Sequence, residues 1–131
     1  MMAALRAGDH HEFLRLDAWL AAGRESGELQ REDRRMGEAL LRLLADLSVP
    51  GALRERGQAL TYPAAFAIAA DYWRVAPAAA LKGLTWTIVE GQVAAAIRLV
   101  RLGHTAGQRI LIVAVPMIER SVVLARTIDD D

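Results

Sequence analysis

Residues 26–47, SGELQREDRRMGEALLRLLADL, decide the fold class because they form the pattern of one long amphipathic helix. Ser26 is a favourable N-cap residue, and Glu28 stands near the positive end of the helix dipole. Apolar residues recur at three- and four-residue intervals, which is the period of an α-helix. The predicted apolar stripe comprises Leu29, Met36, Leu40, Leu43, Leu44 and Leu47. The predicted charged side comprises Arg31, Glu32, Arg34, Arg35 and Glu38.

The segment before this helix predicts another one. Asp9 is followed three residues later by Glu12, which is the spacing of a capping box. Ala22-Gly23 then favours the end of that helix. Its predicted apolar stripe comprises Phe13, Leu16 and Leu20, with Trp19 beside it.

The segment after residue 47 begins with a turn. Ser48-Val49-Pro50-Gly51 contains adjacent proline and glycine, and we expect a short helical stretch around Ala52 to Gln58 after it. Tyr62-Pro63 opens the next helix, because proline is favoured in the first helical turn. That helix is predicted to run to about Trp73.

Two long helices are predicted in the remaining part of the chain. Pro77 opens the longer one, which reaches about Val100, and Gly103 ends that region. Thr105 is then predicted to cap a last helix, with Gln108 in capping-box spacing.

The last helix is apolar on all sides from Ile110 to Ile118. Such a helix is typically buried in a bundle or between subunits. Pro116 is expected to kink it unless the helix ends there. The final residues 129–131 are all aspartate, and we expect this end to be frayed.

These helices predict an all-α fold, an antiparallel helical bundle of about five to six helices in one domain spanning residues 1–131. Strand alternation and hairpin turn signals are weak. The chain is 131 residues long and 53% hydrophobic, which is enough for a substantial core. Its 16 basic and 16 acidic residues balance, which argues against nucleic acid or an anionic membrane as a partner.

The absence of cysteine excludes disulfides, thiolate metal ligands and a cysteine nucleophile. The first residues lack the pattern of a secretory signal peptide, and the longest apolar run is shorter than the roughly 20 residues of a membrane span. We therefore expect a cytoplasmic protein.

No side chains in the sequence form a recognisable catalytic or metal-binding motif. His10 and His11 are adjacent, so on a helix they point about 100° apart and do not converge on one ion. We interpret them and His104 as solvated or capping residues, and we predict no metal site. A phosphate-binding loop, a dinucleotide-binding glycine pattern and a nucleophile elbow are all missing from the sequence. We therefore predict a protein that is not an enzyme.

Three features leave alternatives open. Glu90 and Gln92 lie inside the long apolar helix, so Glu90 is either a general acid or, as we favour, part of an ion pair or a subunit contact. The glycine-containing segment 103–108 either cradles an anion or, as we favour, caps a helix. The charged segment 24–34 is either a solvated helix start or a polar recognition surface.

Several blocks of the sequence stand in a fixed order: Arg24-Glu25-Ser26, Glu28-Leu29, Glu32-Asp33-Arg34, Met36-Gly37, 66–70, Trp86, Glu90, 92–98, Leu102-Gly103 and 105–109. The first of them is similar to the pattern RET-x-EL-x-x-EDRQMG, and the last are similar to W-x-x-x-E-x-Q-x-x-A followed by LGQTAGQR. With these blocks in this order, the sequence resembles the urease accessory protein UreF family.

The resemblance implies a non-catalytic scaffold or chaperone that helps to insert nickel into apo-urease. In that family UreF forms a homodimer, binds UreD (also called UreH) and recruits the GTPase UreG. Nickel and GTP then act through the partner proteins, and no cofactor is expected on this chain. The resemblance starts at the second half of the family pattern, so we expect this domain to be truncated at its N-terminus.

Eight residues are predicted to contact partner proteins. Arg24, Glu25 and Glu28 belong to the first block, and the later block is expected to support the dimer or the UreD interface. The later residues are Glu90, Gln92, Thr105, Gln108 and Arg109. His104 stands where the family has glutamine, and Gln30 where it often has arginine.

Two other functions are kept as alternatives to the scaffold. One is a small helical ligand-binding or enzymatic bundle, which would need titratable groups that converge in a pocket. The other is a degenerate fragment of the family without activity.

Overall fold

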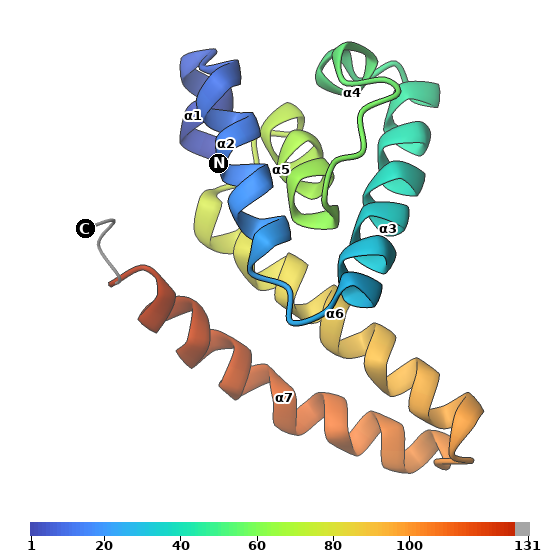
Figure 1. Ribbon diagram of the computed structural model, residues 1–131. Coiled ribbons are helices and arrows are strands. Elements are labelled where there is room, and N and C mark those ends of the chain that lie inside the picture. Colours follow the sequence, from blue (N-terminus) through green and yellow to red (C-terminus); the bar gives the residue numbers. More distant parts are fainter. Residues whose placement is uncertain (128–131) are drawn as a thin grey trace. The chain divides into compact units, whose positions relative to one another are not determined.

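The computed structural model describes residues 1–127, and these contain seven helices and no strand (Figure 1). The helices are α1 (Met2–Ala7), α2 (His10–Ala22), α3 (Gly27–Asp46), α4 (Pro50–Arg54), α5 (Tyr62–Tyr72), α6 (Pro77–Leu99) and α7 (His104–Ala125). The all-α prediction is confirmed. Residues 129–131, for which we expected fraying, lie outside the described part.

The chain divides into two compact units, Met1–Pro77 and a second unit that starts at Ala78. The first unit contains α1 to α5, and the second contains nearly all of α6 and the whole of α7. The prediction of a single domain over residues 1–131 stays a prediction.

Side-chain caps start three helices of the first unit. Asp9 accepts a hydrogen bond from the Glu12 N–H at the start of α2, and Ser26 accepts one from the Leu29 N–H at the start of α3. Thr61 caps α5 in the same way through the Ala64 N–H. These contacts satisfy N–H groups that the first helical turn leaves without a backbone partner. The predicted starts of α2 and α3 are thereby confirmed.

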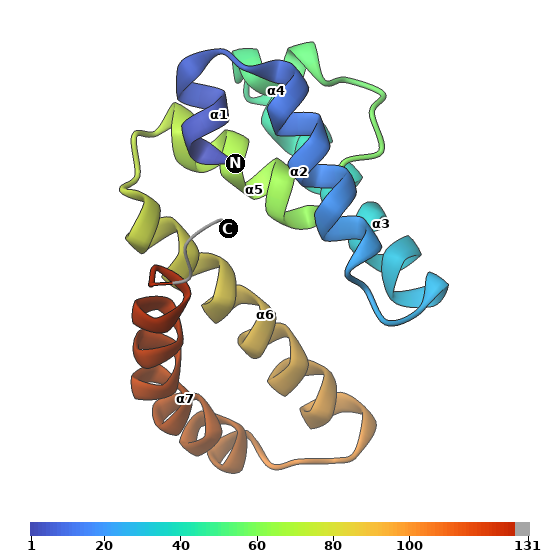
Figure 2. The ribbon, with the colours of Figure 1, turned by 60° about the vertical axis from the view of Figure 1, so that its left-hand side comes forward.

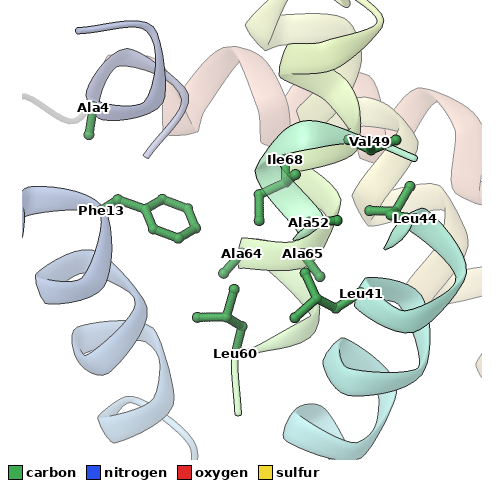
Figure 3. Close-up of a cluster of buried hydrophobic side chains, with 10 residues drawn as sticks. All are labelled: Ala4, Phe13, Leu41, Leu44, Val49, Ala52, Leu60, Ala64, Ala65 and Ile68. Atoms are coloured by element: carbon green, nitrogen blue, oxygen red, sulfur yellow. The ribbon is translucent and has the colours of Figure 1, made fainter. Parts of the chain in front are cut away.

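The core of the first unit gathers side chains from all five of its helices and from the connections between them (Figure 3). Phe13 of α2, Ala52 of α4 and Ala64 and Ala65 of α5 are fully buried. Small residues on α5 let the helix sit deep among its neighbours, since its buried positions are mostly alanine. The core residues are Ala4, Phe13, Leu41, Leu44, Val49, Ala52, Leu60, Ala64, Ala65 and Ile68.

The second unit is a hairpin of two long helices, α6 and α7, joined by a short loop (Figure 2). Leu111, Ile118 and Val122 form the buried side of α7. Lys82 of α6 and Glu119 of α7 form an ion pair at 3.4 Å. Pro116 lies inside α7, and the helix continues through it without a break. The predicted helix from Pro77 is confirmed, and it ends at Leu99.

Three predictions about local structure were incomplete or wrong. The sequence did not predict α1, and α4 begins and ends before the predicted stretch 52–58. Thr105 does not cap α7: Gly103 is the N-cap, and the helix starts at His104 without a side-chain cap. The apolar run in α7 is open within this chain, since Ile112 and Val113 are 70% and 63% exposed, so its burial between subunits stays a prediction.

Candidate protein-binding surface

Arg24, the first predicted contact residue, is held inside the first unit. Its Nε and Nη2 atoms donate hydrogen bonds to Asp33 Oδ2 at 3.1 and 3.0 Å. The other oxygen of Asp33 accepts the backbone N–H of Tyr62 at 3.3 Å. Arg24 therefore ties the loop after α2 to α3, and through Asp33 to the start of α5.

Asp17 of α2, which was not among the predicted site residues, forms a second polar contact. It holds the connection between α4 and α5, just before α5 begins. Its side chain is almost fully buried, and its Oδ1 accepts the Thr61 N–H at 2.8 Å. Its Oδ2 lies 3.8 Å from Arg34 Nη1, and Arg34 also donates to the carbonyl of Ala59. A signal was present in the sequence, since Asp17 stands four residues after Phe13 and so shares its side of the helix.

Gly37 of α3 completes this arrangement. A Cβ atom on Gly37 would overlap the carbonyl oxygen of Leu60 and would lie 2.6 Å from the carbonyl carbon of Thr61. Only glycine lets the backbone of residues 60–61 pack this closely against the helix. The block from Arg24 to Gly37 thus contains five residues with roles inside the unit: Arg24, Ser26, Asp33, Arg34 and Gly37.

The predicted division of α3 into a buried apolar stripe and a charged outer side was partly wrong. Leu44 is the one fully buried member of the predicted stripe, and Leu41, which the prediction left out, is buried beside it. Leu40 is half-buried, and the other four members form a flank that is open to solvent. Arg34, predicted on the charged side, points to Asp17 and Ala59. The exposed fractions of the flanking side chains are 50% for Leu29, 41% for Met36, 55% for Leu43 and 56% for Leu47. Glu25 and Glu28 are also exposed. Glu25 lies just before α3, and Glu28 lies in its first turn.

The other predicted contact residues lie in the second unit and are all exposed. Glu90 and Gln92 are in the second half of α6 and are exposed in this chain, so a subunit contact of Glu90 stays a prediction. Thr105, Gln108 and Arg109 are in the first two turns of α7.

The two helices approach each other closely where the loop joins them. A Cβ atom on Gly107 would lie 2.7 Å from Ile97 Cδ1 and 3.3 Å from Val93 Cγ1. The glycine thus lets the first turns of α7 pack against the last turns of α6. The exposed Thr105, Gln108 and Arg109 are carried on the part of α7 that this packing fixes.

The surface of both units carries many large apolar side chains. In the first unit Trp19 is 68% exposed and Trp73 is 54% exposed. In the second, α7 exposes Ile110, Ile112, Val113, Val115, Met117, Val123 and Leu124. Exposed apolar area of this kind is typical of surfaces that bind proteins, membranes or ligands.

The histidine and acidic side chains of the described residues do not gather as metal ligands do. No group of three or more histidine, aspartate or glutamate side chains among residues 1–127 could hold a metal ion. His10 Nδ1 lies 3.3 Å from Glu55 Oε1, and Glu90 and His104 are both exposed. In the same residues, no helix is both long enough and apolar enough to cross a membrane.

Comparison with known proteins agrees with the resemblance found in the sequence. A model of the UreF family matches residues 1–114. The chain belongs to the UreF family. Urease accessory protein UreF 2 of Brucella anthropi is 57% identical over the full length of this chain. Urease accessory protein UreF of Hahella chejuensis is 37% identical over the full chain, and that of Alkalilimnicola ehrlichii is 44% identical over 72% of it.

The chain covers only part of these UreF relatives. It spans 58% of the Brucella anthropi protein, 59% of the Hahella chejuensis protein and 42% of the Alkalilimnicola ehrlichii protein. No solved structure matches the chain. The sequence-based assignment to the UreF family is confirmed.

Proposed function

We propose that this chain is a non-catalytic scaffold in the maturation of urease. It would act in the cytoplasm as a homodimer, bridge UreD (UreH) and the GTPase UreG, and dock on apo-urease for nickel insertion. Nickel and GTP would act through the partner proteins. The observation that carries this proposal is the match to the UreF family over residues 1–114.

The use that the chain makes of its polar groups supports a scaffold rather than an enzyme. Asp17, the buried acidic side chain of α2, contacts the backbone N–H of Thr61 and the guanidinium group of Arg34. Arg24 and Asp33 likewise contact each other inside the first unit. An active site needs titratable groups that converge on open space for a substrate. These groups instead face protein atoms of the same unit.

The exposed apolar side chains support the proposed partners. A protein that works alone in water rarely exposes so many large apolar groups on one helix as α7 does. Interfaces bury such groups around a few polar contacts. Glu25 and Glu28 on the first unit, and Glu90, Gln92, Thr105, Gln108 and Arg109 on the second, are the polar residues we propose for those contacts. Arg24 would contribute by holding the loop that carries Glu25.

Co-purification and urease activation test this proposal. The full chain would be co-expressed with UreD, UreG and the urease subunits in cells that lack their own UreF. The Brucella anthropi relative would serve as the positive control. We expect the tagged chain to retain UreD and UreG, and urease activity to depend on its presence.

A pair of variants makes the test specific. Replacing Thr105, Gln108 and Arg109 together by alanine is expected to reduce partner retention, because all three are exposed at one end of the hairpin. Replacing Arg31, Arg54 and Arg56 by alanine is the matched control in the first unit. A chain that binds neither partner and restores no activity, beside a working positive control, would refute the scaffold function and leave the inactive fragment.

A further inference from the structure

One side of α7 combines an apolar stripe with a cation. Ile110, Val113, Met117 and Leu124 are three, four and seven residues apart, which places them on one side of the helix. All four side chains are between 46% and 65% exposed. The buried residues Leu111, Ile118 and Val122 lie on another side of α7. The stripe therefore has no partner within the hairpin.

Arg109 marks the N-terminal end of this stripe. It lines a shallow groove together with Ile110, Val113, Ala114 and Met117. We call Arg109, Ile110, Val113, Met117 and Leu124 the α7 stripe. It offers a ridge of apolar side chains that begins beside a guanidinium group.

The charge around the loop end of the hairpin has one sign. Residues 91–118 include Arg98, Arg101 and Arg109 and not a single aspartate or glutamate. All three arginines are exposed, and no salt bridge within residues 1–127 engages them. The chain as a whole is neutral, so this end of the second unit is a local excess of positive charge.

We propose that the α7 stripe binds an amphipathic helix of a partner protein, one whose apolar ridge has three- and four-residue spacing and whose end over Arg109 carries carboxylates. The apolar ridge of such a helix would pack between the side chains of the stripe. Its carboxylates would pair with Arg98, Arg101 and Arg109. Arginine is suited to this because its guanidinium group matches a carboxylate in two-point contact.

Charge favours this partner over a second copy of the chain. A parallel copy would bring Arg109 against Arg109, and an antiparallel copy would bring it towards Arg120, so like charges meet in either direction. The acidic residue Glu119 of α7 is already paired with Lys82. A helix with its own carboxylates removes this repulsion and adds attraction.

The inference deepens the proposed function and rests on it, since that function already assigns Arg109 and the exposed side chains of α7 to partner contacts. A binding test that contains no urease component keeps a failure of the inference distinguishable from a failure of the proposed function.

Two designed peptides provide the probe. Each is a fluorescent helical peptide with leucine at every a and d position of three heptads; one carries glutamate at the flanking positions and its matched partner carries lysine. Fluorescence anisotropy would measure binding to the full chain. We expect the glutamate peptide to bind at least tenfold more tightly than the lysine peptide, and raising the salt concentration to weaken its binding.

Three variants identify the surface. Arg98→Glu, Arg101→Glu and Arg109→Glu together should reverse the preference between the peptides, and Val113→Glu with Met117→Glu should abolish binding of the glutamate peptide. Arg31→Glu, Arg54→Glu and Arg56→Glu change the net charge equally on the first unit and should leave the preference intact. Circular dichroism would verify that each variant remains helical.

Several results would overturn the inference. Equal affinity for the two peptides would remove the role of charge, and a preference that survives the triple reversal at the hairpin would place binding elsewhere. Self-association of the chain that Met117→Glu abolishes would assign the stripe to a second copy. Binding to phosphatidylserine vesicles in place of the glutamate peptide would assign it to a membrane surface.

Discussion

Asp17 carries a carboxylate that is buried where α2 meets the connection between α4 and α5. It accepts the Thr61 N–H at 2.8 Å and faces Arg34 at 3.8 Å. Asp17→Ala removes the acceptor carboxylate. The buried N–H of Thr61 then lacks its hydrogen-bond acceptor, and the guanidinium group of Arg34 loses the nearby negative charge. We expect a loss of about 2–3 kcal/mol in the free energy of unfolding, measured by urea denaturation.

Asp46 supplies the control for that measurement, because it is exposed near the end of α3. Asp46→Ala should change the free energy of unfolding by about 0.5 kcal/mol at most. Equal effects of the two substitutions would show that the Asp17 contacts do not stabilise the unit.

Gly37 and Gly91 are both inside helices, yet alanine should have opposite effects at the two positions. At Gly37 the added Cβ meets the backbone of Leu60 and Thr61, which cannot move aside as a flexible side chain can. We expect Gly37→Ala to cost about 2–3 kcal/mol, as overpacking does. At Gly91 nothing lies within 4 Å of the added atom, so Gly91→Ala should gain about 0.5–1 kcal/mol from helix propensity.

Thermal unfolding of the two glycine variants beside the parent chain would test this difference. A rise in melting temperature for Gly91→Ala with a fall for Gly37→Ala is the expected result. A stable Gly37→Ala variant would contradict the close packing of α3 against residues 60–61.

Glu12 gives a prediction about pH. Its carboxylate accepts hydrogen bonds from Arg15 Nε at 2.6 Å and Nη2 at 2.7 Å, and this contact lowers the pKa of Glu12 below its ordinary value. A lowered pKa stabilises the fold above the pKa of the unfolded chain, and that contribution is lost as the pH falls through the folded value. Arg15→Ala should raise the pKa of Glu12 towards its ordinary value in an NMR titration, whereas Arg35→Ala should leave it unchanged.

At the scale of single helices, adjacent residues of α3 should differ strongly. Leu44 is 2% exposed in the core, whereas Leu43 is 55% exposed on the open flank. Leu44→Ala should cost about 2–4 kcal/mol because it leaves a cavity, while Leu43→Ala should cost less than about 1 kcal/mol. Urea denaturation of both variants measures the contrast, and similar losses would mean that the flank is covered in solution.

The helices themselves could be predicted where local chemistry decides them. Asp9 and Ser26 start their helices through their own side chains, and Pro63 and Pro77 stand at helix starts as expected. The start of α7 could not be predicted in this way. Thr105 and Gln108 have the spacing of a capping box, but the backbone enters the helix two residues earlier at Gly103.

The orientation of a helix on its neighbours lies beyond what its own spacing determines. The stripe of α3 is wider than the buried face, and the contact of Gly37 with residues 60–61 turns Leu41 and Leu44 inwards and leaves Met36 and Leu43 outside. The short helix α1 was missed for a related reason. Six residues are too few to be stable alone, and α1 is supported by packing against α2 and α5.

At the scale of the whole chain, the sequence identified the family because its blocks recur in order over nearly all of the residues. It did not separate the residues that hold the chain together from those that remain for partners. Arg24 is used within the first unit, whereas Gln92, Gln108 and Arg109 are exposed. Both groups of residues occur in the same blocks of the sequence, so the pattern alone does not distinguish a residue that holds the fold from one that contacts a partner.

The two units should differ in local stability, because the larger core belongs to the first. Ten buried residues form its cluster, whereas the described buried positions of α6 and α7 are Ala80, Val93, Gly107, Leu111, Ile118 and Val122. Segments with few buried apolar contacts open at lower free energy. Hydrogen exchange of the full chain should therefore proceed faster in α6 and α7 than in α3 and α5.

Addition of the glutamate peptide tests whether the amides of α7 exchange fast because the α7 stripe is uncovered. Burying Val113 and Met117 against a second helix would add apolar contacts, and exchange in α7 should slow in proportion to the sites occupied. Exchange in α3 and α5 serves as the internal control and should not change. If the amides of α7 exchange as slowly as those of α5 before any peptide is added, the two units do not differ in local stability. Such slow exchange would require contacts that the α7 stripe lacks in this structure.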